Sequence, residues 1–197
     1  MKYIPRLIFF LILLCFVSKR SGAQVKDNFG FPEIITFDSL QYQLTTTYHP
    51  NNLYYKVVYL RTGESEDHFN KIITIDFVRT KADSYDFVNK KTKALMERKK
   101  TDPAVLIDEL TNYKTGEYFL DFITSDQLSG NLNILDRNLC RYKNYTDPTG
   151  HNGVILFAIT ERVYGDSIKV YLKNLKKTIK FDRRKVLNLN IPDFIIK

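Results

Sequence analysis

Residues 118–164 decide the fold: three apolar runs, YFLDFI (118–123), LNILDRNLCRY (132–142) and VILFAITERVY (154–164), are separated by two polar breaks. Residues 126–130 and 147–150 form these breaks and are rich in Asp, Ser, Pro and Gly, which favour turns. Three strands joined by such short breaks predict an antiparallel meander. No catalytic or cofactor motif lies on the stretch, so it predicts architecture rather than chemistry.

The first 23 residues have the features of a secretory signal peptide. Lys2 and Arg6 precede an apolar run from Leu7 to Val17, and Ser21-Gly22-Ala23 places small residues before Gln24. The run of 11 residues is much shorter than the roughly 20 that span a bilayer. We therefore expect residues 1–23 to be cleaved, no transmembrane segment to remain, and the product to be periplasmic or secreted.

Cleavage changes the charge and the cysteine content. The formal net charge of the full chain is +8, and it falls to +4 because the signal carries four basic residues and no acidic one. Cys15 leaves with the signal, so Cys140 is the single mature cysteine and no intrachain disulfide can form. Cys140 lies in a strand pattern, which favours a buried small hydrophobe over a reactive thiol. Export and the modest charge argue against a nucleic-acid partner.

The N-terminal half alternates between strand patterns and polar breaks. Residues 24–33 are expected to be a flexible lead-in because Gly30 and Pro32 interrupt any regular pattern. Strands are expected within 34–48, over 53–61 and over 69–78, with turns or loops at 49–52 and 62–67. In the strand over 53–61, Tyr55, Val57 and Tyr59 share one face.

Two stretches change to a helical period. The first, over about 84–99, follows Asp83, and its narrow apolar stripe contains Phe87, Val88, Leu95 and Met96. The second spans 167–181, with Asp166 as the candidate N-cap and an apolar face of Ile168, Tyr171, Leu172, Leu175 and Ile179. A short apolar return segment is expected over 186–191.

Residues 104–110 allow two interpretations. Asp102 followed by Pro103 would start a helix well. Residues 111–116 nevertheless resemble a hairpin loop that ends at Gly116 and leads into the strand at Tyr118, which favours a strand over 104–110.

The order of elements predicts an α+β domain over residues 34–197. We expect an antiparallel sheet of about six to eight strands covered by two main helices, about 84–99 and 167–181. N-terminal hairpins, a helix, a long meander and a C-terminal helix make an element order similar to that of PsbP-like domains, over residues 35–190. That resemblance implies an exported α/β/α domain that binds or braces partners. A lipocalin-like barrel is the competing architecture, and the central helix disfavours it.

Motifs for catalysis, cofactors and metals are missing from the sequence. It contains no HExxH, CxxC, GxSxG or phosphate-binding glycine loop, and its three histidines are His49, His68 and His151, each in an expected loop. A single mature cysteine excludes the common structural zinc sites. We therefore assign no catalytic residue, no metal ligand and no cofactor.

Charged residues that interrupt apolar strands are the remaining candidates for chemistry. Asp76, Asp121, Glu161 and Arg162 each lie within a strand pattern. Alternation favours the solvated face of a half-buried strand for all four. The alternative is an inward-facing acid–base pair in a cleft, which would make the protein a small periplasmic hydrolase.

Two groups of residues are candidates for binding. Tyr55 and Tyr59 represent a tyrosine-rich sheet that can line a ligand groove or belong to an ordinary core. The C-terminal helix presents Lys173, Lys176 and Lys177, with Arg183 and Arg184 near its end, and this basic patch can meet an envelope protein or an anionic surface, or be only solvated. The sequence thus predicts an exported non-catalytic binding or accessory domain, with an envelope-surface subunit as the alternative that uses the basic helix.

Overall fold

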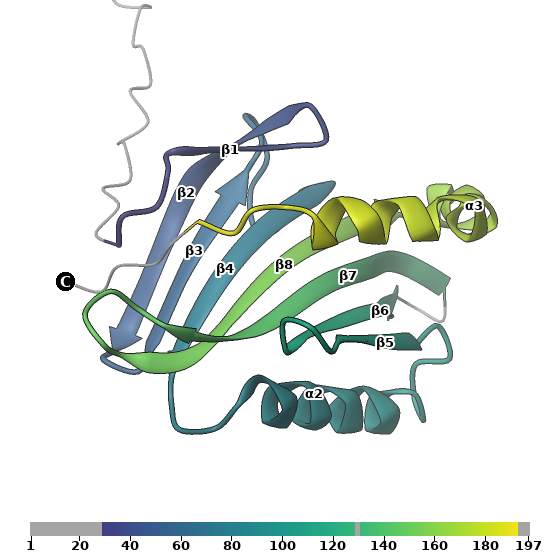
Figure 1. Ribbon diagram of the computed structural model, residues 1–197. Coiled ribbons are helices and arrows are strands. Elements are labelled where there is room, and N and C mark those ends of the chain that lie inside the picture. Colours follow the sequence, from purple (N-terminus) through teal and green to yellow (C-terminus); the bar gives the residue numbers. More distant parts are fainter. Residues whose placement is uncertain (1–28, 129–130, 193–197) are drawn as a thin grey trace, which may run out of the picture.

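The computed structural model describes residues 29–128 and 131–192 of the chain (Figure 1). Within these residues the elements follow the predicted order of strands, helix, strands and helix. They are β1 (Ile34–Phe37), β2 (Leu40–Asn51), β3 (Tyr54–Leu60), β4 (Lys71–Arg79), α2 (Ser84–Arg98), β5 (Leu106–Asn112), β6 (Glu117–Leu128), β7 (Asn131–Thr146), β8 (Asn152–Tyr164) and α3 (Ser167–Leu187). The predicted signal peptide, residues 1–23, lies outside the described residues.

The described strands form one eight-stranded sheet in the order β1-β2-β3-β4-β8-β7-β6-β5. All neighbouring strands are antiparallel, and β5 to β8 form a meander in which each strand pairs with the next. The predicted α+β class, with six to eight antiparallel strands and two helices, is confirmed. The sheet is open, with β1 and β5 at its edges, so the alternative of a lipocalin-like barrel is wrong.

The two helices cover opposite faces of the sheet (Figure 1). Successive side chains of a strand point to opposite faces. On β6, Leu120 and Phe122 belong to the apolar cluster that contains residues of α2, whereas Ile123 belongs to the cluster that contains residues of α3. Each helix therefore buries its own side of the same strands.

α2 begins where the sequence predicts, because Asp83 caps it. The Asp83 carboxylate accepts a hydrogen bond from the backbone N–H of Asp86, and the Asp86 carboxylate accepts one from the backbone N–H of Asp83. Val88 and Leu95 are buried against the sheet. Met96 is 54% exposed, so the predicted stripe is wrong at that position.

α3 is longer than predicted. The expected end was residue 181, but the helix continues to Leu187, and Val186 is fully buried in its last turn rather than in a return segment. The polar residues Asp182 and Arg183 resemble a helix exit in the sequence, yet both form ion pairs with the sheet and so keep the helix on it. Of the predicted apolar face, Ile168 and Leu175 are buried. The other three positions, Tyr171, Leu172 and Ile179, are half-buried.

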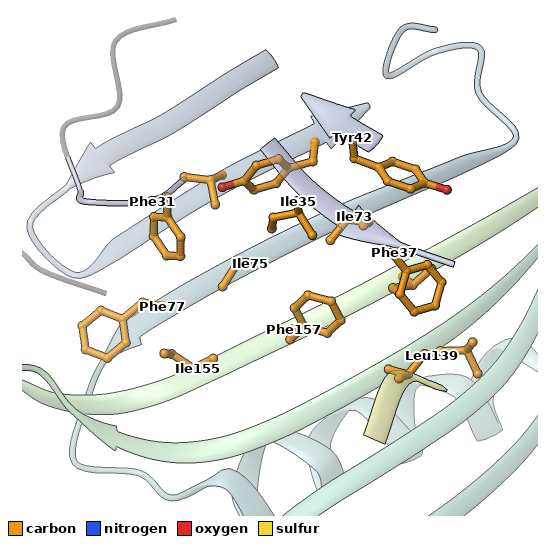
Figure 2. Close-up of a cluster of buried hydrophobic side chains, with 14 of the residues drawn as sticks. Phe31, Ile35, Phe37, Tyr42, Ile73, Ile75, Phe77, Leu139, Ile155 and Phe157 are labelled. Atoms are coloured by element: carbon orange, nitrogen blue, oxygen red, sulfur yellow. The ribbon is translucent and has the colours of Figure 1, made fainter. Parts of the chain in front are cut away.

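The largest apolar cluster lies on the α3 face of the sheet and extends from the N-terminal strands across β8 to Leu139 of β7 and Phe119 of β6 (Figure 2). Phe29 and Phe31 are buried in it, which corrects the expectation of a flexible lead-in for residues 29–33. Tyr55 and Tyr59 are buried there too, so the core interpretation applies to both. The Tyr59 hydroxyl donates to the carbonyl of Pro32 at 2.8 Å, which ties the segment before β1 to the sheet.

Two turn predictions have different outcomes. The turn expected over 49–52 is wrong, because β2 continues to Asn51 and pairs there with Tyr54. The hairpin loop before β6 is confirmed: Gly116 has a φ of +67°, a conformation that glycine adopts without strain. Residues 106–112 form β5, which decides the open question over 104–110 in favour of a strand.

A search of the described residues for membrane spans finds no helix that is long and apolar enough to cross a bilayer.

Candidate functional site

A pocket of about 430 Å³ opens at the end of the sheet where α3 begins. We call it the sheet-end pocket. Its wall comes from the start of β2, the connection between β3 and β4, the end of β8 and the first turns of α3. The residues that matter for its chemistry are Tyr42, Arg61, Lys71, Glu161, Ser167 and Tyr171. Its volume lies within the range of roughly 300–1,000 Å³ that is usual for small-molecule sites.

Glu161 is the carboxylate of the sheet-end pocket, and both of its oxygens are engaged. Lys71 Nζ lies 3.0 Å from Glu161 Oε1, and the Tyr171 hydroxyl donates to Oε2 at 2.7 Å. Arg137 Nη1 is 3.8 Å from the same Oε2. Burial, together with the nearby Glu161 charge, raises the pKa of Tyr171, so the phenol stays protonated and remains a donor.

Tyr42 supplies a hydroxyl that no other described residue uses. Its side chain is 0% exposed and belongs to the same apolar cluster as Phe37 and Ile73 (Figure 2), yet its hydroxyl has no hydrogen-bond partner within the described residues. Burial raises the pKa of Tyr42 to about 12. The group is therefore a neutral donor at physiological pH. Leaving a buried polar group unpaired costs about 1–3 kcal/mol, so an acceptor in the pocket would remove an existing penalty.

Arg61 differs from the other two cations of the pocket because its guanidinium has no ion-pair partner among residues 29–128 and 131–192. Lys71 is paired with Glu161, and Arg162 forms two hydrogen bonds of 2.8 Å with Asp136. The guanidinium of Arg61, in contrast, makes no ion pair or side-chain hydrogen bond to any residue that the structure describes. Its charge is close enough to the Tyr42 hydroxyl to favour the ionised phenol.

The two ends of α3 are treated differently. At the C-terminal end, Arg141 Nη1 donates to the carbonyls of Val186 at 3.1 Å and Leu189 at 2.6 Å, where a cation suits the helix dipole. At the N-terminal end, Asp166 occupies the N-cap position, but its side chain makes no capping hydrogen bond. Ser167, in the first turn, lines the sheet-end pocket. The positive end of the helix dipole therefore faces this pocket without a side-chain cap.

A buried network of charges holds the second half of α3 on the sheet. Arg137 is 0% exposed and binds both oxygens of Asp121 at 3.1 and 2.9 Å, while its Nη1 reaches Asp182 of α3 at 2.8 Å. Arg183 of α3 donates to Asp121 at 2.8 Å and pairs with Asp108 of β5 at 2.6 Å. Burial acts to lower the pKa of Arg137, but Asp121 and Asp182 outweigh it and raise the pKa, so the guanidinium stays charged.

The strand carboxylates occupy three different environments. Asp121 is 5% exposed and lies in the charged network under α3, so the prediction of a solvated strand face is wrong for it. Glu161 is half-buried on the same face, in the sheet-end pocket. Asp76, on the opposite face, accepts a hydrogen bond from the Tyr54 hydroxyl, and burial raises its pKa although this bond opposes the rise. The fourth residue, Arg162, is half-buried against Asp136.

The histidines do not meet these carboxylates. His49 lies in β2, not in a loop, and stacks on Tyr55 with ring centroids 4.2 Å apart. His68 stacks on Tyr164 at 4.9 Å. The hydrolase hypothesis requires a histidine beside Asp76, Asp121 or Glu161, and the structure gives those carboxylates tyrosine, arginine and lysine partners instead.

His151 contacts a carboxylate within one loop. Its Nδ1 lies 3.0 Å from Asp147 Oδ2 and 2.8 Å from Thr149 Oγ1, in the connection between β7 and β8. A nucleophile–base relay uses the two ring nitrogens for different partners. Here both contacts involve Nδ1, so the arrangement is that of a hydrogen-bonded turn.

The basic residues predicted on α3 separate into two groups. Lys173, Lys176, Lys177 and Arg184 are exposed. Arg183 is not part of that surface, because its guanidinium is paired with Asp108 and Asp121 under the helix. The predicted patch is thus smaller at its C-terminal end than the sequence suggests.

Two other hollows have weaker claims to function. One, of about 480 Å³, lies at the start of α2, where Asn144 already accepts a hydrogen bond from the backbone of Ser84. Another, of about 480 Å³, lies along β2 and β3, where Tyr48 donates to Glu66 at 2.7 Å. In both, the polar groups named here have partners, unlike the hydroxyl of Tyr42.

Sequence reasoning missed Tyr42 and Arg61 as site residues. Tyr42 has the alternating pattern of any strand tyrosine, and Arg61 is the last residue of a predicted strand. Hairpin pairing was the available signal. β2 and β3 are antiparallel, with Gln43 opposite Leu60, so Tyr42 and Arg61, which come before Gln43 and after Leu60, become neighbours. A turn expected over residues 49–52 does not give the observed pairing of β2 with β3, so it does not place Tyr42 beside Arg61.

The fold and the site define an α+β protein with an open antiparallel sheet and a polar pocket at one end of it. A family model matches residues 29–191, which is more than half of the chain, and the chain therefore belongs to that family. The matched span includes all the residues of the sheet-end pocket. Neither the curated proteins nor the solved structures contain a match to this chain.

Proposed function

We propose that the protein is a non-catalytic binding domain whose ligand lies in the sheet-end pocket. The observation that carries this proposal is the Tyr42 hydroxyl, a buried donor without a partner among the described residues in the wall of a pocket. Convergent polar groups in a concave, partly apolar site are what small-molecule binding requires. Four separate parts of the chain supply them here, so folding itself assembles the pocket.

The engagement of Glu161 favours binding over catalysis. A general acid or base must exchange a proton with the substrate. Both oxygens of Glu161 are engaged by Lys71 and Tyr171, which hold the carboxylate in one position. This carboxylate therefore acts as a structural member of the pocket wall.

The same proposal places the protein outside the cytoplasm. The basic start, the apolar run and the small residues before Gln24 support export to the periplasm or the medium. The intact mass of the protein recovered after expression with its own N-terminus tests this point. We expect a chain that begins at Gln24, and a chain that retains residues 1–23 would contradict export by this signal.

Nuclear magnetic resonance of the ring signals of Tyr42 and Tyr171 tests the binding function. We would titrate benzoate, phenyl phosphate, benzamide and benzylamine separately into the protein. At least one probe should shift both tyrosine signals saturably and be recovered unchanged. If no probe saturates, the sheet-end pocket is not a small-molecule site. If a bound probe is chemically converted, the non-catalytic assignment is wrong.

A second candidate function uses the outer face of α3. Its exposed lysines surround two exposed apolar side chains, Val170 at 62% and Phe181 at 60%. Apolar side chains flanked by lysines on one helix face suit an anionic lipid surface. Co-sedimentation with vesicles that contain about one-third phosphatidylserine tests it. We expect the triple variant Lys173→Glu, Lys176→Glu and Lys177→Glu to lose binding, whereas absence of wild-type binding would dismiss this candidate.

A further inference from the structure

We infer that the sheet-end pocket recognises its ligand through an oxyanion, either a carboxylate or a phosphate group. This inference rests on the proposed binding function and names the chemical class of the ligand. Three independent features of the pocket favour an anionic acceptor: a guanidinium and a buried hydroxyl that both lack an acceptor among the described residues, and the positive end of a helix.

Arg61 provides the charge. Its guanidinium has five N–H donors in a planar fork that matches a carboxylate or a phosphate. Lys71 and Arg162 are paired with Glu161 and Asp136. The guanidinium of Arg61 makes no ion pair in the described part of the chain, since the Glu64 carboxylate contacts the backbone N–H of Arg61 instead. An anion in the pocket would therefore pair with Arg61 without displacing an existing ion pair.

Tyr42 provides direction. A protonated phenol can donate one hydrogen bond, and the acceptor of that bond is missing among the described residues. Hydrogen bonds to ionised acceptors are shorter and stronger than those to neutral ones. Because the Tyr42 hydroxyl is closed to solvent in the ligand-free structure, an oxygen of the ligand has to enter the pocket wall beside it to accept this bond.

α3 provides a third source of positive potential. This helix has 21 residues, and Arg141 satisfies carbonyls at its C-terminal end, whereas the N-terminal end has no side-chain cap and opens on the pocket through Ser167. Backbone N–H groups and the dipole at a helix N-terminus favour anions. The N-terminal end of α3 and the side chains of Arg61 and Tyr42 all line the sheet-end pocket.

Glu161 does not cancel this preference. Its charge is shared among Lys71, Tyr171 and, at 3.8 Å, Arg137, so its oxygens are already turned toward donors. Leu40 and Val163 add apolar lining to the pocket. The lining of the pocket therefore suits a small ligand that combines an apolar part with one anionic group.

Four probes with the same ring and different head groups test the inference. Isothermal titration of the intact protein would compare benzoate, phenyl phosphate, benzamide and benzylamine. Benzoate and benzamide are nearly equal in shape, so the difference between them reports charge. We expect one or both anions to bind at least about tenfold more tightly than benzamide, because hydrogen bonds to charged groups are stronger than those between neutral groups. The ratio of the two anions identifies the oxyanion.

Arg61→Gln and a matched control locate the effect. Arg61→Gln should weaken anion binding about tenfold and weaken the binding of benzamide less. Arg184→Gln removes the same charge from the exposed face of α3 and should change neither. Equal affinity for benzoate and benzamide, or tighter binding of benzylamine, would overturn the oxyanion inference while the binding function stands. If none of the four probes binds, the binding function itself falls.

Discussion

α2 and α3 lie on opposite faces of one sheet and are held there by different forces. α2 packs on the sheet through apolar contacts, with Val88 and Leu95 against a cluster that includes Cys140. α3 uses an apolar cluster in its first half and the charges around Arg137 in its second. Apolar contact is non-directional, whereas a guanidinium bound to two carboxylates accepts few geometries. The helix whose first turn must form a pocket wall is the one held by directional bonds.

The difference suggests why charges are tolerated beneath α3. Buried ion pairs add little net stability compared with apolar contacts of the same volume, because the charges must be taken out of water. Removing one partner is nevertheless strongly destabilising, since it leaves an uncompensated buried charge. We therefore expect the charged network to determine where α3 lies, and the apolar clusters to supply most of the folding free energy.

Arg137→Met should have the largest effect on stability. It leaves Asp121 buried with one partner fewer and Asp182 without this cation, and we expect a loss of about 3–5 kcal/mol in the free energy of unfolding. Urea denaturation followed by circular dichroism measures it. Arg184→Met, on the exposed side of the same helix, is the control and should change stability by no more than about 0.5 kcal/mol. A similar small loss for Arg137→Met would show that the network does not hold α3.

Leu95→Ala should break the other side of the comparison. The residue is 3% exposed under α2, and truncation should cost about 2–4 kcal/mol through lost burial and the cavity it leaves. Cys140 gives a local probe, because it is buried in the same cluster and burial raises its pKa to about 12. Native labelling with a thiol reagent should accelerate in Leu95→Ala. When the two variants are compared at conditions of equal overall stability, labelling of Cys140 should be slower in Arg137→Met than in Leu95→Ala. Equal labelling rates would show that the two helices open together.

Asp102→Asn tests the connection that follows α2, and it predicts a pH dependence. The Asp102 carboxylate accepts hydrogen bonds from the backbone N–H and hydroxyl of Ser125 at 2.8 and 2.7 Å and from Arg98 at 3.1 Å. Burial acts to raise the pKa of Asp102, but these donors outweigh it and lower the pKa below its ordinary value of 3.8. The stabilisation is therefore complete above pH 3.8 and is lost as the pH falls through the lower folded value.

At neutral pH we expect Asp102→Asn to cost about 1–3 kcal/mol. Measured by chemical denaturation between pH 7 and pH 2, the gap between wild type and variant should narrow only below about pH 4. A gap that stays constant over the whole range would show that the charge of Asp102 contributes nothing.

The smallest effect should come from reversing the exposed charges of α3. Lys173→Glu, Lys176→Glu and Lys177→Glu together should shift the melting temperature little, because exposed substitutions usually change stability by no more than about 0.5 kcal/mol each. Differential scanning calorimetry at low and high salt checks this. Unfolding of the triple variant would mean that the lysine face, and not the network around Arg137, orients the helix.

The order of the elements along the chain and the helix starts could be predicted because local sequence patterns determine them. Alternation in β3 placed Tyr55, Val57 and Tyr59 on a single face, and the Asp83 cap marked the start of α2. The end of α3 could not be found this way. Asp182 and Arg183 look like solvent-facing residues until the sheet supplies Arg137, Asp108 and Asp121 as partners.

The pocket could not be predicted for a related reason. Tyr42 and Glu161 belong to strands that are not neighbours in the sheet. Only the packing of α3 across the sheet end brings them into one wall, and no local pattern encodes that contact.

Tyr42→Phe tests the central claim most directly, because binding and stability should respond in opposite ways. The variant removes a hydroxyl that has no partner among the described residues, so its melting temperature should equal or exceed that of the wild type. Its affinity for benzoate or phenyl phosphate, whichever binds the wild type, should fall about tenfold, since a hydrogen bond to a charged acceptor is lost. Unchanged anion affinity, or a melting temperature lower by several degrees, would contradict the assignment of Tyr42 as the ligand's donor.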